Sequence, residues 1–267
     1  MKSMRACGAV LLLAVLAGCG SDDDASAERL RILVTNDDGV AADGIDQVVE
    51  ALAADPNNDV VVCGPNGNRS GTGDMTGPSG VCGDLSVAAA TTLSGYPATA
   101  INGCPADSVN YALDVIYPSD AAPHVVISGI NEGQNVSEQI ATQISGTVGA
   151  AKTAARGGVP ALAASQGLRA GGAHPDYPSG VAAVLEWLDD HRAELLAGGG
   201  APTAVDNLNV PSCEAGTIRG TLSDVPLAAS LTGFLDPQDC TSTLENPLDD
   251  VQAFLNGYIT LSTVPLD

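Results

Sequence analysis

Arg31-Ile-Leu-Val-Thr-Asn-Asp-Asp-Gly39 is the stretch of this 267-residue chain that decides the fold. Its first five residues form a short, mostly apolar run, which is typical of a strand buried on both faces, and its last four are turn residues. Residues 44–54 follow with apolar side chains at helical spacing, and residues 59–63 form a second apolar run. Strand, helix and strand within about 30 residues make a βαβ unit, which predicts a parallel sheet with right-handed crossovers.

The same alternation continues along the chain and predicts a three-layer α/β/α Rossmann-like fold. Further strands are expected over residues 124–128, 159–164, 205–210 and 257–264, and helices over residues 105–116, 147–156 and 180–196. Ser179 is the expected cap of the last helix. Gly198-Gly-Gly-Ala-Pro202 marks a boundary between an α/β/α core, residues 29–198, and a C-terminal region, residues 199–267, that completes the sheet.

The composition excludes several classes of protein. The chain has 10 Lys+Arg against 32 Asp+Glu, a formal net charge of −22, and 3% aromatic residues. This charge opposes binding to a nucleic-acid polymer, which needs a basic surface, and the shortage of aromatic rings leaves little for stacking bases. Charged residues make up only 16% and apolar residues 45%, so a disordered polyanion is also excluded and a sizeable core is expected.

The N-terminus has the pattern of a bacterial lipoprotein signal. A positively charged start precedes an apolar run, residues 8–18, that is too short to span a bilayer as a mature helix. The run ends in Leu16-Ala-Gly-Cys19, which resembles a lipobox and implies cleavage before Cys19 and lipid attachment to its sulfur. We predict a signal peptide over residues 1–18 and a solvated tether over residues 19–28. An ordinary signal peptide with an incidental cysteine is the alternative.

Five cysteines follow residue 19, and no two of them form a CxxC pair. A zinc or thioredoxin-type site is therefore not expected. Because export places the chain in an oxidising compartment, we predict two disulfides, Cys82–Cys104 and Cys213–Cys240. Cys63 then remains a buried thiol inside a strand.

Polar loops follow three of the predicted strands, at residues 36–39, 66–76 and 129–146. Ligands of open parallel sheets bind outside the carboxyl ends of the strands, where these loops lie. Adjacent Asp37 and Asp38 repel each other, and a hard divalent cation relieves that repulsion while taking oxygen ligands. An Asx turn that caps the next helix explains the same two residues equally well. Spacing alone leaves the metal site and the cap open.

Longer motifs occur in the order found in one known family. They are Arg31 to Gly39, Asn68-Arg-Ser-Gly71, Gly103-Cys-Pro-Ala-Asp107, Ser128-Gly-Ile-Asn131 with Gly133 and Asn135, Ser145-Gly-Thr-Val-Gly-Ala-Ala151, Asn207-Leu-Asn-Val-Pro211 and Asp250 to Thr263. Over roughly residues 30–266 the chain resembles the SurE family, the stationary-phase survival proteins that are metal-dependent 5′/3′-nucleotidases. Cys104 stands where threonine is usual in the family, and Ile144 where an aromatic residue is common. The resemblance implies the SurE fold with a C-terminal oligomerisation region.

The resemblance also implies an active site. One divalent metal ion, Mg²⁺ or Mn²⁺, would be held by oxygen ligands from Asp37, Asp38, Ser70 and Asn131. The phosphate would be surrounded by Asn36, Asn135, Ser145, Gly146 and Thr147, the last three at a helix start, where free N–H groups favour an anion. The ion would lower the pKa of an attacking water, and Asp37 would accept its proton. Asp37, Asp38 and Asn36 are thus the predicted catalytic residues.

From these expectations we predict an enzyme that hydrolyses nucleoside 5′/3′-monophosphates to nucleoside and phosphate. The expected location is the bacterial cell envelope, with a lipid anchor in the membrane and the protein exposed to the periplasm or the exterior. The resemblance implies a homodimer or homotetramer with swapped C-terminal contacts. Two alternatives are a broad-specificity acid phosphatase with the same site, and a non-catalytic lipid-anchored protein that binds nucleotide or phosphate.

Other motifs indicate no further chemistry. The run from Gly146 to Thr153 differs from a P-loop at Ala151, where glycine is required, so it is predicted to be a packed helix with Lys152 on its surface. His124, His174 and His191 show no metal-ligand spacing and are predicted to be surface or strand-edge residues. No GxSxG sequence is present, which argues against a serine hydrolase.

Overall fold

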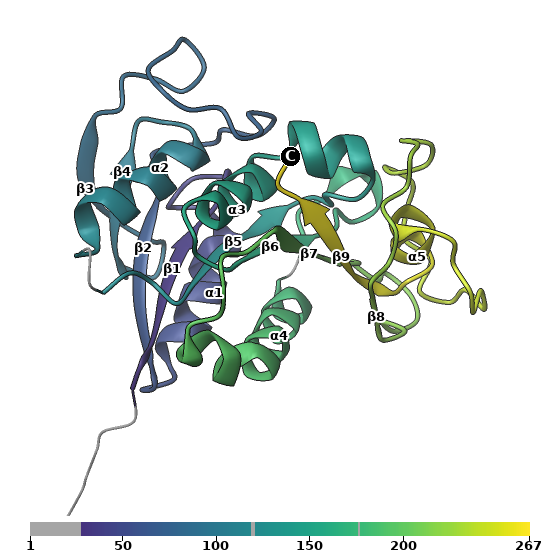
Figure 1. Cartoon of the computed structure of the whole chain (residues 1–267). Helices are drawn as coiled ribbons and strands as arrows, with labels where there is room; N and C mark the ends of the chain where they lie inside the picture. Colours follow the sequence, from purple (N-terminus) through teal and green to yellow (C-terminus); the bar gives the residue numbers. More distant parts are fainter. Residues whose placement is uncertain (1–27, 119–120, 176) are drawn as a thin grey trace, which may run out of the picture.

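A computed structural model describes residues 28–118, 121–175 and 177–267, and in these residues a nine-stranded sheet is the centre of the fold (Figure 1). Its strand order is β3-β4-β2-β1-β5-β6-β7-β9-β8. Strands β4, β2, β1, β5, β6 and β7 are parallel, whereas β3 and β9 run antiparallel to their neighbours β4 and β7. The strand bounds are β1 Leu30–Thr35, β2 Asn58–Pro65, β3 Val87–Thr91, β4 Pro97–Ile101, β5 Val125–Glu132, β6 Ala161–Gln166, β7 Ala204–Val210, β8 Thr221–Ser223 and β9 Ile259–Pro265.

Helices cover both faces of this sheet and make the three layers (Figure 1). One face carries α1 (Asp43–Ala53) and α4 (Pro178–Ala197), and the other carries α2 (Pro105–Tyr111) and α3 (Gly146–Arg156). Short π-helical turns at Ala112–Ile116 and Ile140–Ile144 and a 3-10 turn at Ala170–Gly172 lie in the connections, and α5 (Asp250–Leu255) precedes β9. The α/β/α architecture predicted from the alternation of strands and helices is confirmed.

The two faces are packed with side chains of different size. Between the sheet and α1/α4 the core consists mainly of large aliphatic side chains, with Trp187 at its margin. Between the sheet and α2/α3 it is rich in alanine, including Ala150, Ala151, Ala154 and Ala155 of α3. Because alanine and glycine have small side chains, α3 approaches the sheet and its loops closely. A methyl group at Gly149 would lie 2.0 Å from the carbonyl oxygen of Gly73.

Several local expectations are corrected. The short strands β3, β4 and β8 and helix α5 were not expected as elements, because their small or mixed residues give no clear period. The helix expected over residues 105–116 is α-helical only to Tyr111 and continues as a π-helical turn. Ser179 does not cap α4, because the helix starts at Pro178 and the capping position is Tyr177. Proline suits the first turn, since its missing N–H would have no helical partner there.

Lys152 was predicted on the surface of its helix, and that prediction is wrong. Only 4% of the residue is exposed, and its Nζ donates to the carbonyl oxygen of Thr142 at 3.3 Å. The π-helical turn Ile140–Ile144 packs over α3 and covers the lysine stem. Burial lowers the pKa of Lys152, and the nearby Arg156 adds to this effect.

The cysteine predictions are confirmed. Disulfides join Cys82 to Cys104 and Cys213 to Cys240, and Cys63 is a free, buried thiol in β2. The first disulfide attaches the loop after β2 to the start of α2. The second closes the segment between β7 and α5. The two disulfides join residues 22 and 27 positions apart in the sequence, and closing such loops restricts the unfolded chain.

The predicted signal peptide, the lipid site Cys19 and nearly all of the predicted tether lie outside the described residues. Within the described residues, no helix is both long enough and apolar enough to span a membrane. The sheet extends on both sides of residue 198, with β7, β8 and β9 contributed by the C-terminal region. The division into a core and an oligomerisation region stays a prediction.

Candidate active site

The loop after β1 holds the two predicted metal-binding carboxylates in a tight turn. Asn36 makes this turn, because its Oδ1 accepts from Gly39 N–H at 3.2 Å and its Nδ2 donates to the Gly39 carbonyl at 3.0 Å. Gly39 adopts a φ of +106°, a region that side chains disfavour. Asn36 is fully buried, and both polar atoms of its side chain make hydrogen bonds within the turn. Its expected contact with phosphate stays a prediction.

The loop after β2 packs against this turn. The Arg69 N–H donates to the Asp37 carbonyl at 2.6 Å, and Val40 N–H donates to the Pro65 carbonyl at 3.0 Å. The Asn68 side chain bridges the loops, because its Nδ2 donates to Asp38 Oδ1 at 3.1 Å while its Oδ1 accepts from Ser70 N–H at 3.0 Å. Ser70 is exposed and is joined to Asp38 through Asn68, and its hydroxyl is free of described hydrogen bonds. The two loops therefore act as one unit.

The loop after β5 supplies the third side of the site. Glu132 N–H donates to Asp38 Oδ2 at 2.9 Å, so both oxygens of Asp38 are held by neighbouring loops. Asn131 donates its Nδ2 to the Gly133 carbonyl at 2.6 Å, which turns its Oδ1 away from that contact. No described residue donates a hydrogen bond to this Oδ1. The oxygen is therefore available to a ligand.

The start of α3 lies directly against Asp37. The Thr147 hydroxyl donates to Asp37 Oδ1 at 2.7 Å, and Ser145 caps the helix by accepting from Val148 N–H at 3.1 Å. A methyl group at Gly146 would lie 2.8 Å from Asp37 Cβ, so only glycine permits this approach. The N–H groups of a helix start favour an anion, and here those of Gly146 and Thr147 face the Asp37 carboxylate.

Asn135 lies one layer deeper than the other predicted phosphate ligands. Its Nδ2 donates to Ser165 Oγ at 2.8 Å and to Thr147 Oγ1 at 3.3 Å, and its backbone carbonyl accepts from Asn207 Nδ2 at 2.8 Å. These contacts join α3 to β6 and β7 and fix the Thr147 hydroxyl under Asp37. The geometry supports a positioning role for Asn135, and its direct contact with phosphate stays a prediction.

Burial dominates the electrostatics of the two carboxylates. It raises the pKa of Asp37 above its ordinary value, although hydrogen bonds from Thr147 and the start of α3 act in the opposite direction. Burial also raises the pKa of Asp38 to about 7, with a further rise from the Asp37 carboxylate. None of the ion pairs between described residues includes Asp37 or Asp38. A buried carboxylate next to a half-buried one, without a cation, is costly, and a bound cation removes that cost.

The donor set therefore fits a hard divalent cation. Asp37, Asp38, Ser70 and Asn131 offer only oxygen atoms, as Mg²⁺ and Mn²⁺ prefer. The described residues contain another compact group of metal-binding types, Cys82, Cys104 and Asp107, but its two sulfurs form a disulfide. The predicted site is thus the one whose chemistry suits a cation.

Three residues near the site were not singled out by the sequence. Glu132 occupies a variable position of the Ser-Gly-Ile-Asn motif, and His174 was expected to be an ordinary surface residue. In the structure His174 Nδ1 lies 2.7 Å from Glu132 Oε2, and Tyr177 lies beside this pair. The connection that carries His174 and Tyr177 is more than 40 residues away from Glu132 in sequence, so no local pattern could have linked them.

The fold and these loops define a three-layer α/β/α protein in which adjacent carboxylates lie beside a helix start, an arrangement suited to phosphate chemistry with a hard cation. A family model described as "Survival protein SurE" matches residues 32–227. The chain belongs to the SurE family.

Similar proteins agree with this membership. The chain is 35% identical over 255 residues to a 5′-nucleotidase SurE of Methylocella silvestris, an alignment that covers 89% of this chain and 94% of the relative. It is also 35% identical over 263 residues to a 5′-nucleotidase SurE of Methanoregula boonei, with 90% and 94% covered. The crystal structure of the SurE protein from Aquifex aeolicus is similar in fold, with a TM-score of 0.64, 25% sequence identity, and 89% of this chain and 94% of that chain covered.

Proposed function

We propose that this chain is a metal-dependent 5′-nucleotidase that hydrolyses nucleoside monophosphates, including 3′-monophosphates, to nucleoside and phosphate. The observation that carries the proposal is the pair of adjacent carboxylates, buried Asp37 and half-buried Asp38, next to the start of α3 without a cation from the described residues. Membership of the SurE family and the names of its 5′-nucleotidase relatives support it.

Some residues of the chain would hold the cation, and others would lie against the phosphate. Asp37, Asp38, Ser70 and Asn131 would hold Mg²⁺ or Mn²⁺, which supplies positive charge to the phosphate and lowers the pKa of a water molecule. The positive end of the α3 dipole would lie beside the phosphate, and Ser145 and Thr147 keep that helix start in place. A cation at this point also makes an acidic protein compatible with an anionic substrate.

The experiment is phosphate release from 5′- and 3′-nucleoside monophosphates by the purified protein, with Mn²⁺, with Mg²⁺ and with EDTA. We expect metal-dependent release that Asp38→Asn reduces by at least about 10²-fold. Asp59→Asn is the matched control, because Asp59 is exposed on β2 outside these loops. Tight nucleotide binding without release would overturn the proposal in favour of a binding protein. Equal turnover in EDTA would overturn the role of the cation.

We also propose that the protein is exported and anchored in the bacterial cell envelope through lipid on Cys19. The apolar N-terminal run ending at Cys19 supports this proposal, as do the two disulfides, which are typical of oxidising compartments. Recovery of the uncleaved protein in the cytoplasmic fraction would contradict it. A homodimer or homotetramer is proposed from the family resemblance, and sedimentation of a monomer would contradict that assembly.

A further inference from the structure

A pocket of about 290 Å³ opens next to the predicted cation site. We name it the Tyr177 pocket. It is bordered by Asp38 and Asn68 on the side of the candidate active site, and by Asp43, Leu93, Glu132 and His174 around the rest of its wall. Its volume is at the lower end of the range for small-molecule sites. Asp38 and Asn68 border both the candidate active site and the Tyr177 pocket. A group attached to a phosphate at the active site would therefore enter this pocket.

Tyr177 gives the pocket a polar group without a partner. Only 3% of the residue is exposed, and its hydroxyl forms no hydrogen bond with another described residue. The ring cannot move toward α1, because even a methyl group at Gly44 would lie 2.9 Å from Tyr177 Cε1. Burial raises the pKa of Tyr177, and the carboxylates of Glu132, Asp38 and Asp43 raise it further. The hydroxyl itself is not fully enclosed, so water or a ligand in the pocket can be its hydrogen-bond partner.

Glu132 links this pocket to the candidate active site. Its backbone N–H holds Asp38 Oδ2 at 2.9 Å, while its side-chain Oε2 lies 2.7 Å from His174 Nδ1. The imidazole fixes the carboxylate, and the other carboxylate oxygen has no described hydrogen-bond partner. The side chains of Glu132 and His174 are 33% and 82% exposed, so a ligand can reach them from solvent.

The residues that line the Tyr177 pocket determine which chemical class of ligand it favours. Three carboxylates border the pocket and no lysine or arginine does, so a second phosphate would be repelled. The described carboxylates and His174 do not form a compact group of the kind that holds a metal ion. Carboxylate oxygens accept hydrogen bonds from hydroxyl groups, as acidic residues do with the ribose hydroxyls of nucleotides in other folds. The exposed Leu93 adds an apolar surface at the rim.

We propose that the Tyr177 pocket binds the ribose of the nucleotide, with Glu132 and the Tyr177 hydroxyl recognising its hydroxyl groups, so that the protein selects ribonucleotides over 2′-deoxyribonucleotides. This inference rests on the proposed nucleotidase function for the position of the phosphate. A hydrogen bond to a charged group that only one of two ligands can form corresponds to about 10- to 100-fold discrimination.

The test compares kcat/KM for a ribonucleoside 5′-monophosphate and its 2′-deoxy form, using the base that the unaltered protein hydrolyses fastest. We expect a ratio of at least about 10 in the unaltered protein, falling toward 1 in Glu132→Gln and in Tyr177→Phe. The ratio is insensitive to a general loss of activity, which affects both substrates equally. Glu138→Gln is the matched control, because Glu138 is an exposed glutamate in the same connection that does not line the pocket.

A second measurement separates this inference from the proposed function. Calorimetric binding of adenosine and 2′-deoxyadenosine in EDTA requires neither phosphate nor cation. Tighter binding of adenosine that Glu132→Gln abolishes supports the pocket even if no phosphate is ever released. Efficient hydrolysis with a ribose-to-deoxyribose ratio near 1, together with equal binding of the two nucleosides, overturns the pocket and leaves the nucleotidase intact.

Discussion

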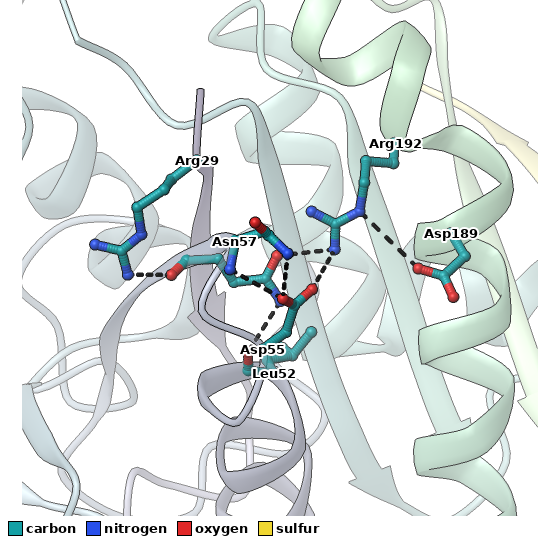
Figure 2. A network of polar contacts seen from close by, with 7 residues as sticks. Arg29, Leu52, Asp55, Asn57, Asp189 and Arg192 are labelled. Atoms are coloured by element: carbon teal, nitrogen blue, oxygen red, sulfur yellow. Dashed lines mark hydrogen bonds and ion pairs between the residues drawn. The ribbon is translucent and has the colours of Figure 1, made fainter. Parts of the chain in front are cut away.

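The two ends of the parallel sheet both carry clustered aspartate and asparagine residues, but among the described residues Asp55 at the amino end is paired with a cation of the protein, whereas Asp37 and Asp38 at the carboxyl end are not. At the amino end, Arg192 of α4 donates to Asp55 Oδ2 at 3.1 Å and to Asn58 Oδ1 at 2.9 Å (Figure 2). Arg29 donates to the Asn58 carbonyl, and Asn58 Nδ2 donates to the Leu52 carbonyl at 2.9 Å. At the carboxyl end, Asp37 and Asp38 form no described ion pair.

This difference separates a structural cluster from a functional one. Asp55 is partly exposed and its charge is balanced, so it closes the turn between α1 and β2 at little cost. Asp37 is buried and unbalanced, and burial raises its pKa. Groups that lower stability persist where they serve a ligand, which is the usual compromise at active sites. Aspartate at the amino end therefore has a structural role, whereas aspartate at the carboxyl end has a functional one.

The largest expected effect comes from exchanging aspartate for asparagine at each end. Asp37→Asn should reduce metal-dependent phosphate release by about 10³-fold, because a cation ligand loses its charge. Its Tm in EDTA should not fall, since the amide can still accept from Thr147 and the buried charge is gone. Asp55→Asn should keep activity within about twofold and lower Tm by up to about 3 °C. Activity assays and thermal unfolding check both variants. A lower Tm for Asp37→Asn but not for Asp55→Asn would contradict the difference drawn between the two ends.

A smaller effect is expected from adding one methyl group where α3 meets Asp37. Gly146→Ala places a carbon 2.8 Å from Asp37 Cβ and 2.9 Å from Oδ2, so the carboxylate must shift. We expect about a 10²-fold loss of kcat/KM with retained folding, because displacements on the order of 1 Å in a site have this effect. Gly199→Ala is the control, since its new carbon meets only Glu194 Oε1 at 3.7 Å. Full activity of Gly146→Ala would show that the α3 contact does not position Asp37.

The smallest effect concerns the interior of the sheet between the two ends. Burial raises the pKa of the Cys63 thiol to about 12, and its Sγ donates to the Ser108 carbonyl at 3.3 Å. Because the thiolate is the reactive form, about 10⁻⁴ of this thiol is ionised at pH 8, and labelling should rise about tenfold per pH unit toward pH 12. Mass spectrometry after iodoacetamide should find Cys63 unmodified in the folded protein at pH 8 and modified in guanidinium. Rapid labelling of the folded protein would mean that the interior opens readily.

Local sequence patterns predicted the elements that are long or continuously apolar. The runs that became β1, β2 and β6 are buried on both faces, so their hydrophobicity alone indicated parallel central strands. The strands β3 and β4 have alternating small and exposed residues that gave no comparable signal. Lys152 was misplaced for a related reason, because helical spacing indicates which residues share a face but not which loop covers that face.

The candidate site likewise contains residues that local sequence could predict and residues that it could not. The adjacent carboxylates, the glycines and the helix start are contiguous in sequence, so motif resemblance could place Asp37, Asp38 and Gly146 together. The expected contacts of Asn36 and Asn135 with phosphate stay predictions, and the structure adds that their side chains make hydrogen bonds that shape the turn and anchor α3. His174 and Tyr177 could not have been found, because only the packing of α4 on α1 brings them to Glu132.

By itself, the sequence determined the α/β/α class, the loops at the carboxyl edge and the SurE resemblance, and the pairing predicted for four cysteines is confirmed by the structure. These properties depend on local hydrophobicity, turn chemistry and a small number of cysteines, all of which can be read from short stretches of sequence. Only the tertiary structure decided how deeply Asp37 is buried, how closely Gly146 approaches it, and which residues form the Tyr177 pocket. Those properties depend on contacts between segments far apart in the chain, where close packing rather than local preference determines the distance.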